Sequence, residues 1–211
     1  MALFERVLVL APHTDDGEFG CGGTIAKLVE LKKTVYYAAF SSAEKSVPEN
    51  LPRNILRTEV EEATKVLGIE KENLILYNYE VREFPAHRQS ILEDLIVLKR
   101  VLKPDLVFLP SLRDLHQDHK TIAEEGIRAF KNSTVLSYEI PWNNLVFSTH
   151  CFIRLSEENV TKKVEALKCY RSQANRYYAN EPFIRSLAKT RGTQIGTEYA
   201  ESFEVIRLFL E

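Results

Sequence analysis

The sequence predicts an α/β protein, a single-domain Rossmann-like three-layer sandwich over residues 1–211 whose mostly parallel sheet has helices on both faces. Three observations favour this fold. Short runs of aliphatic and β-branched residues alternate along the chain with amphipathic runs of helical period. A hydrophobic content of 45% with 27% charged residues is ordinary globular composition and enough for a packed core. No linker, repeat or low-complexity tract divides the chain, so one domain is favoured over two small ones.

The first half of the chain alternates strand and helix twice. Residues 7–11 form a continuous apolar run and are predicted as the first strand, followed by a helix over about 22–33. Residues 34–41 are rich in β-branched and aromatic side chains, which predicts the second strand. A loop with two prolines then leads into a helix over about 53–67, which Gly68 ends as a C-cap.

The same alternation continues in the second half and becomes less regular after about residue 140. Residues 74–77 are predicted as the third strand. Between residues 91 and 102 four apolar side chains recur on one helical face, and Pro104 ends that helix before a strand at 106–109. The remaining predicted elements are a helix over about 120–130, strands at 135–138 and 152–155, a helix over about 157–170 and a strand at 204–210.

Two polar clusters stand where predicted strands end. The segment His13–Asp16 follows the first strand, and the segment His116–His119 follows the strand at 106–109. In a parallel sheet both clusters reach the C-terminal edge, where open α/β folds bind their ligands. Imidazole with carboxylate is a ligand set whose commonest occupant is zinc. Each cluster alone is also compatible with a salt-bridged helix start, but together they predict a metal-dependent hydrolase.

A catalytic zinc takes three protein ligands and leaves one position for water. His13 and Asp16, three residues apart across a tight turn, are predicted to face the metal, with His119 as the third ligand. Zinc lowers the pKa of its bound water from about 15.7 to roughly 7, which produces hydroxide at neutral pH. Because this ligand set discriminates poorly among divalent ions, Fe²⁺ is an alternative to Zn²⁺.

The remaining residues of the clusters are assigned to proton transfer and charge stabilisation. Asp15 is predicted to face the metal-bound water as general base. His116 is the candidate donor to the developing oxyanion, either protonated or in the correct tautomer. Asp118 either favours that state of His116 or holds His119 from behind as a hydrogen-bond acceptor. Glu18 is expected to favour the positive N-terminus of the following helix rather than the metal.

The net charge and the cysteines of the chain restrict the binding partners and the cellular compartment that we expect. A net charge of -2 does not indicate binding to nucleic acid or to an anionic membrane. Individual arginines could still bind a small anionic substrate. The N-terminal apolar run is interrupted by Glu5 and Arg6 and is too short for a secretory core or a membrane span. Cys21, Cys151 and Cys169 lack zinc-ribbon spacing and are expected to be reduced thiols of a cytoplasmic protein.

These motifs resemble the PIG-L/LmbE-like family of zinc-dependent N-deacetylases, which remove acetyl groups from amino-sugar derivatives. The resemblance covers nearly the whole chain. It comprises the opening motif from Ala11 to Thr24, a helix from Glu59 to Gly68, the second metal motif at 116–119, and C-terminal motifs at 168–173 and 199–203. The resemblance implies the same roles for the two clusters as their chemistry does, and it implies that homo-oligomers are possible.

The sequence differs from the family's usual motifs at two positions, and the resemblance implies further candidate substrate contacts. Thr14 stands where the family usually has proline, which alters the loop but removes no ligand. Leu56 stands where relatives carry a substrate-contacting arginine, so Arg57 beside it is a candidate substrate contact. Arg191 is a second candidate because it lies in the resembling C-terminal segment. Trp142 either stacks on a sugar ring or anchors the core.

The predicted activity is therefore hydrolysis of an N-acetyl group from an amino sugar or amino-sugar conjugate, nucleotide-linked conjugates included. The alternative is a Rossmann-like nucleotide- or sugar-binding protein without hydrolase activity. The glycine-rich run from Gly17 to Thr24 lacks the strict dinucleotide-binding order and carries acidic residues where a pyrophosphate would sit. We interpret that run as a tight turn into the first helix.

Overall fold

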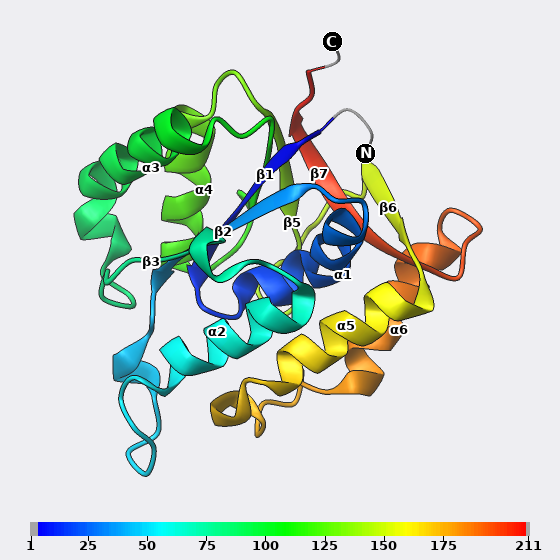
Figure 1. Ribbon diagram of the computed structural model, residues 1–211, viewed down its shortest axis with the longest axis horizontal. Helices are drawn as coiled ribbons and strands as arrows, with labels where there is room; N and C mark the ends of the chain where they lie inside the picture. The colour runs from blue at the N-terminus through cyan, green and yellow to red at the C-terminus, as the bar shows by residue number, and fades with distance from the viewer. Residues whose placement is uncertain (1–3, 210–211) are drawn as a thin grey trace.

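A single seven-stranded sheet organises the computed structural model, which describes residues 4–209 (Figure 1). Its strands are β1 (Arg6–His13), β2 (Thr34–Ser41), β3 (Leu74–Leu76), β4 (Leu106–Pro110), β5 (Thr134–Tyr138), β6 (Cys151–Leu155) and β7 (Tyr199–Arg207). The helices are α1 (Asp16–Glu30), α2 (Ile55–Leu67), α3 (Arg88–Leu102), α4 (Gln117–Ala129), α5 (Glu157–Lys168) and α6 (Glu181–Thr193). None of the helices between residues 4 and 209 is long and apolar enough to cross a bilayer.

The strand order is β3-β2-β1-β4-β5-β7-β6. The first five strands in this order are parallel, and β7 runs antiparallel to both of its neighbours. This confirms the predicted α/β fold with a mostly parallel sheet. The chain winds outward from β1 in one direction and from β4 in the other, so the C-terminal ends of these adjacent strands form the switch point of the sheet. Both predicted clusters follow these two strands.

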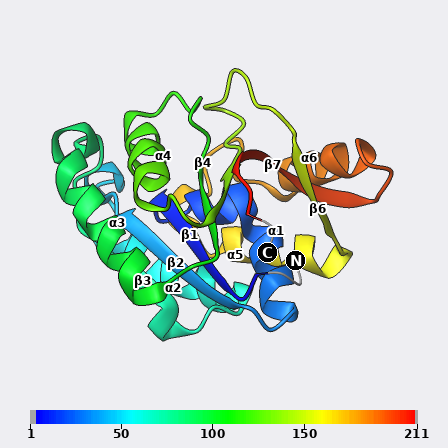
Figure 2. The same cartoon turned by 90° about the horizontal axis from the view of Figure 1, so that it is seen from above.

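Two apolar cores lie on opposite faces of the sheet, which explains the unbroken apolar run in β1. Val7 and Val9 point into the core formed with α1, α2 and α5, whereas Leu8 and Leu10 point into the core formed with α3 and α4. All four side chains are fully buried. A strand covered on both sides needs apolar residues at every position rather than at alternate ones. Figure 2 shows the sheet between these two helix layers.

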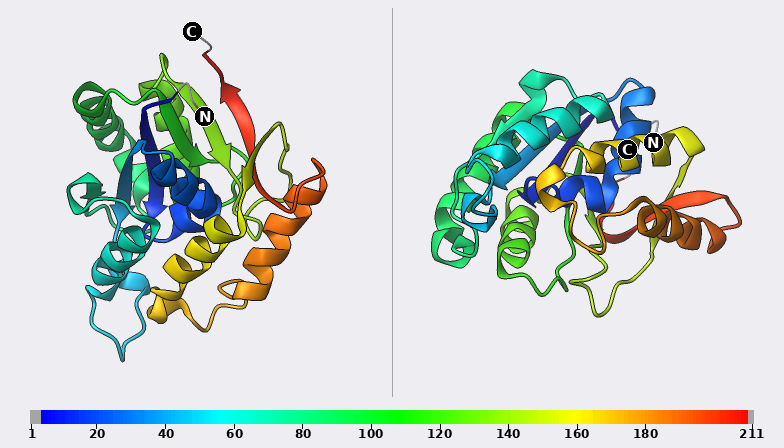
Figure 3. Two further views of the ribbon diagram at one scale, coloured as in Figure 1. Left: turned by 45° about the vertical axis from the view of Figure 1, so that its right-hand side comes forward. Right: turned by 90° about the horizontal axis from the view of Figure 1, so that it is seen from below.

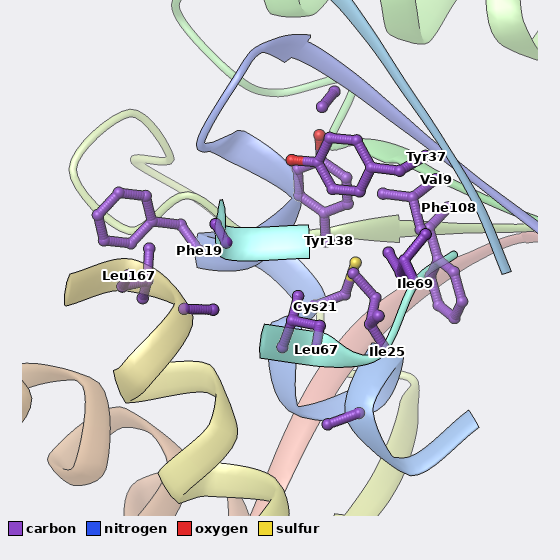
Figure 4. Close-up of a cluster of buried hydrophobic side chains, with 14 of the residues drawn as sticks. Val9, Phe19, Cys21, Ile25, Tyr37, Leu67, Ile69, Phe108, Tyr138 and Leu167 are labelled. Carbon is purple, nitrogen blue, oxygen red and sulfur yellow. The ribbon is translucent and has the colours of Figure 1, made fainter. Parts of the chain in front are cut away.

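Helix α1 begins at Asp16, six residues before the predicted start near Gly22, and it is kinked at Cys21, where φ is -147°. Glycines precede and follow the kink because the helix lies against large side chains. A Cβ on Gly20 would lie 2.2 Å from the Tyr138 ring, and one on Gly17 would lie 2.5 Å from Tyr37. Tyr37, Cys21 and Tyr138 lie together in the buried cluster between α1 and the sheet (Figure 4).

The backbone groups freed by this kink are bonded by two charged side chains from distant parts of the chain. Lys163 Nζ of α5 donates to the Phe19 carbonyl at 2.7 Å. The Glu201 carboxylate of β7 accepts from the backbone N–H groups of Gly23 and Thr24 at 3.0 and 2.7 Å. Lys163 and Glu201 also pair with each other at 2.7 Å, and both are buried. The half of α1 after the kink therefore has its own N-terminal cap.

The C-terminal region differs most from the prediction. Helix α6 was not predicted, because its buried stripe consists only of Ile184, Ala188 and Gly192. It packs beside α5 and against β7, as the two views of Figure 3 show. Strand β7 begins at Tyr199 rather than residue 204, because its buried positions include polar side chains that hide the strand pattern. The predicted strand end at Leu210 lies outside the described residues.

Candidate active site

The two polar clusters meet at the switch point of the sheet. His13 is the last residue of β1, and Asp16 is the first residue of α1 after a two-residue turn. His116 is the N-cap of α4, and its Nδ1 accepts a hydrogen bond from the Asp118 backbone N–H at 3.2 Å. His119 lies in the first turn of the same helix. The sheet thus brings together residues about a hundred positions apart in sequence.

Three donor atoms form a nearly equilateral triangle. His13 Nδ1 lies 3.1 Å from Asp16 Oδ2, His119 Nε2 lies 3.2 Å from the same oxygen, and the two nitrogens are 3.3 Å apart. In a tetrahedral zinc site with bonds of about 2.0–2.1 Å, adjacent ligand atoms are roughly 3.3–3.4 Å apart. The three residues therefore fit a divalent cation. His116 can also offer a nitrogen, but only within a wider group whose atoms span up to 4.8 Å.

The far side of each histidine ring is held by a buried carboxylate. His13 Nε2 lies 3.0 Å from Asp118 Oδ2, and His119 Nδ1 lies 2.7 Å from Asp114 Oδ2. A carboxylate behind a ligating imidazole fixes its tautomer and raises its basicity. Asp118 thus supports His13, not His119 as one of our two interpretations had it. The partner of His119 is Asp114, whose role was not predicted from the sequence.

The charges of the side chains in this cluster favour the binding of a cation. Burial lowers the pKa of His119, but the carboxylates of Asp16 and Asp114 outweigh it and raise that pKa to about 10. The pKa of His13 is also raised, because Asp16 and Asp118 outweigh its burial. Burial raises the pKa of Asp16, but the two histidines hold it well below its usual range. This surplus of negative charge around the donor triangle is what binding of a cation requires.

Asp15 and His116 lie beside the triangle in a different electrostatic setting. Burial, followed by the nearby Asp16 carboxylate, raises the pKa of Asp15 to about 6. Asp15 occupies the N-cap position of α1, yet none of the described backbone N–H groups of that helix donates to its carboxylate. An aspartate at this position ordinarily caps the helix. Burial and the neighbouring His119 lower the pKa of His116 to about 4.

Two buried tyrosines hold the turn between β1 and α1. The hydroxyls of Tyr37 and Tyr170 lie 2.8 and 2.7 Å from the Thr14 carbonyl, and both also contact the Glu18 carboxyl group. Burial raises the pKa of Glu18 to about 8, although the hydrogen bonds from Tyr37 and Tyr170 act in the opposite direction. Glu18 lies in the first turn of α1, as expected, and its contacts with two buried tyrosines are an additional role that was not predicted. The turn is held without the family's usual proline.

A cavity of about 400 Å³ opens onto the donor triangle. Asp15, His116 and Trp142 line it together with the three donor residues. The Trp142 ring stacks on Tyr178 with centroids 3.7 Å apart and an interplanar angle of 11°, and Phe19 meets Trp142 edge-on. Trp142 thus belongs to an aromatic wall beside the candidate metal site.

Two predicted substrate contacts do not line this cavity. The Arg191 guanidinium is held by both carboxylate oxygens of Glu139 at 2.8 and 2.6 Å, in a second hollow that Trp142 also lines. Arg57 Nε lies 3.6 Å from Glu44 Oε1 and borders a neighbouring hollow, while Leu56 lines the cavity itself. The other lining residues were not identified from sequence; they are Phe19, Ala43, Ser46, Val81, Arg82, Asn143, Gln173, Arg176 and Tyr178.

Comparison with known proteins agrees with this geometry. The family model PIG-L, described as GlcNAc-PI de-N-acetylase, matches residues 8–130. The uncharacterized deacetylase YaiS of Escherichia coli is 30% identical over 178 residues, covering 79% of this chain and 90% of that protein. Diacetylchitobiose deacetylase of Thermococcus kodakarensis is 24% identical, covering 96% of this chain and 83% of that protein.

The fold has a similar solved counterpart. The structure of N,N'-diacetylchitobiose deacetylase from Pyrococcus horikoshii, complexed with its inhibitor MPG, superposes with a TM-score of 0.81 at 25% identity. The similarity covers 97% of this chain and 85% of that one. The family match spans both polar clusters and the sheet edge that joins them. With the Escherichia coli relative, it shows that the chain belongs to the PIG-L, or LmbE-like, family of deacetylases.

Proposed function

We propose that this protein is a divalent-metal-dependent N-deacetylase, with zinc as the favoured metal, that hydrolyses the acetamide of an amino sugar or amino-sugar conjugate. The observation that carries the proposal is the donor triangle of His13, Asp16 and His119 beside Asp15 and His116 in one cavity. The diacetylchitobiose deacetylases among its relatives support an N-acetylated sugar as substrate.

His13, Asp16 and His119 would hold the divalent cation, which would supply Lewis-acid chemistry to the acetamide carbonyl and to the attacking water. Asp15 takes the proton from that water, because its carboxylate faces the cavity and is not used to cap α1. The same carboxyl group then returns the proton to the leaving amine. Asp114 and Asp118 keep the two ligand imidazoles in the tautomers that leave His13 Nδ1 and His119 Nε2 free to bind the cation.

His116 donates a hydrogen bond to the oxyanion as a neutral imidazole. Its Nδ1 accepts from the Asp118 backbone N–H, so the single proton of the neutral ring lies on Nε2. Of the two states allowed from sequence, protonated or correct tautomer, this contact favours the second. The aromatic wall that includes Trp142 gives a sugar ring a flat apolar surface beside the reacting amide.

His116→Ala is expected to lower kcat by about 10²- to 10³-fold, the usual cost of removing one oxyanion donor. His116→Asn is the matched variant, because asparagine can still cap α4 but does not reach as far into the cavity. We expect the alanine variant to lose stability and activity, and the asparagine variant to lose activity alone. Thermal unfolding and steady-state acetate release measure the two effects. A fully active asparagine variant would show that His116 only caps the helix.

The proposal as a whole is tested by acetate release from N-acetylated sugars and sugar nucleotides, using purified zinc-loaded protein. We expect release from at least one member of this panel, loss of release on chelation, and recovery with Zn²⁺ or Fe²⁺. Nucleotide that co-purifies with metal-free protein, with no hydrolysis, would favour the non-hydrolytic alternative instead. Bound metal without release from any panel member would contradict the proposed substrate class.

A further inference from the structure

Two arginines line the candidate active-site cavity without a carboxylate partner. Arg82 lies in the loop after β3, and Arg176 lies in the loop after the short helix at Arg171–Gln173. No carboxylate oxygen within residues 4–209 lies within 4.0 Å of either guanidinium. We propose that these arginines bind an anionic group, a carboxylate or a phosphate, on the N-acetylated sugar. This inference rests on the proposed deacetylase function and narrows its substrate class.

Arg82 is fixed at the cavity by its backbone rather than by its side chain. Its φ is +74°, a left-handed conformation that non-glycine residues adopt rarely and at an energetic cost. The Arg82 backbone N–H donates to Asp118 Oδ2 at 2.6 Å, and that oxygen also contacts His13 Nε2. The loop is thereby bound to the candidate metal centre. Among residues 4–209 the guanidinium hydrogen-bonds only to the Ser46 hydroxyl, at 3.3 Å, and Arg82 is otherwise exposed at the cavity.

Arg176 is oriented by the aromatic wall. Its Nη1 donates to the Tyr178 hydroxyl, and its guanidinium carbon lies 5.7 Å from the centroid of the Tyr178 ring. Tyr178 in turn stacks on Trp142. A guanidinium has five N–H donors in a rigid planar fork, so most of them remain free for a ligand. That fork matches the oxygens of carboxylate and phosphate groups.

The alternative to anion binding is that the two arginines neutralise the acidic residues of the site. The pairing pattern argues against it. Asp16, Asp114 and Asp118 already contact the rings of His13 and His119. Asp15 is the remaining carboxylate of the cavity: burial raises its pKa and the charge of Arg176 acts against that rise, but no guanidinium nitrogen of Arg176 lies within 4.0 Å of its oxygens. By contrast, two arginines just outside the cavity are paired within the chain. Arg57 and Arg191 each face a glutamate. The charges of Arg82 and Arg176 are left for a molecule that enters the cavity.

The test compares neutral and anionic substrates of one sugar. The probes are N-acetylglucosamine, its 1-phosphate and 6-phosphate, and N-acetylmuramic acid, which carries a carboxylate. We expect at least one anionic probe to have the higher kcat/KM. Arg82→Gln and Arg176→Gln should each lower kcat/KM for that probe by about 10- to 100-fold, mainly through KM, and leave the neutral sugar within about threefold. The phosphate and carboxylate arms identify which anion is preferred.

Arg53→Gln is the control, because Arg53 is exposed and lies outside the cavity lining. It should alter neither substrate class. Equal losses for neutral and anionic sugars in the cavity variants would mean that the arginines act on Asp15 or on the fold, which would overturn the inference. A wild-type preference for the neutral sugar would also overturn it.

Calorimetric titration of the same probes into zinc-loaded protein separates this inference from the proposed reaction. If no probe is hydrolysed, the proposed substrate class is contradicted, and the binding comparison is still available. Tighter binding of an anionic probe that is weakened in both arginine variants would still support the anion site. Equal binding of neutral and anionic probes would reject it independently of turnover.

Discussion

Asp16→Asn is expected to lose bound metal and activity together, whereas Asp15→Asn should keep its metal and lose about 10²- to 10⁴-fold in kcat. The two carboxylates are adjacent in sequence but have different surroundings. Asp16 Oδ2 lies within 3.2 Å of ring nitrogens of His13 and His119 and also accepts from the His13 backbone N–H at 2.8 Å. An amide there carries no charge to hold a cation.

Asp15 has none of these contacts with the histidine rings. Its carboxylate faces the cavity from the turn between β1 and α1. Asparagine has nearly the same shape but cannot accept the proton of the attacking water, so metal binding should survive the loss of turnover. Metal content per protein chain, measured after dialysis, and acetate release at saturating substrate distinguish the two variants.

A specific result would contradict each of these two expectations. Full activity of Asp15→Asn would remove this residue from proton transfer. Retention of one metal per chain by Asp16→Asn would mean that the ion is held by His13, His116 and His119, the wider donor group that the structure also contains. In that case His116→Asn should release the metal, and the proposed oxyanion role of His116 would fail with it.

Much of the fold and the two clusters could be predicted because their determinants are local. A strand covered on both faces is apolar at consecutive positions, so β1 and β4 are visible in the sequence without any knowledge of their neighbours. Parallel pairing of β1 and β4 then brings the segments that carry His13 and His119 to the same sheet edge. The donor triangle follows from these two facts and the chemistry of the side chains.

The residues that could not be predicted depend on contacts between distant segments. Asp114 becomes the partner of His119 only through the conformation of the loop after β4, in which its other carboxylate oxygen accepts from the His116 backbone N–H. Arg82 and Arg176 reach the cavity from loops that have no regular pattern. Arg191 was predicted as a substrate contact from its segment alone, and its partner Glu139 lies 52 positions away.

The start of α1 illustrates the same limit. Its glycines weaken the helical signal, so the sequence predicts the helix only from near Gly22, just after the kink. The break at the kink is tolerated because Lys163, 144 positions away, bonds the freed Phe19 carbonyl before it. After the kink, Glu201 caps the helix, and its acceptor oxygen and the Gly23 N–H come from residues 178 positions apart. A local pattern cannot contain this information.

Glu201→Ala is accordingly expected to lower the free energy of unfolding by about 3–5 kcal/mol, the usual cost of removing one partner of a buried ion pair. The substitution leaves the Lys163 ammonium buried with only the Phe19 carbonyl, and it leaves the N–H groups of Gly23 and Thr24 without their acceptor. Urea unfolding followed by circular dichroism measures the effect.

The control is Glu198→Ala, three residues earlier, because Glu198 is exposed and faces Lys189 at 3.9 Å across solvent. Its effect should stay within about 0.5 kcal/mol. Adding Lys163→Met to Glu201→Ala should recover part of the loss, because it removes the unpaired charge but not the uncapped N–H groups. If Glu201→Ala costs less than about 1 kcal/mol, the kink at Cys21 does not depend on this capping carboxylate, and the packing of Gly17 and Gly20 against Tyr37 and Tyr138 must hold α1 in place alone.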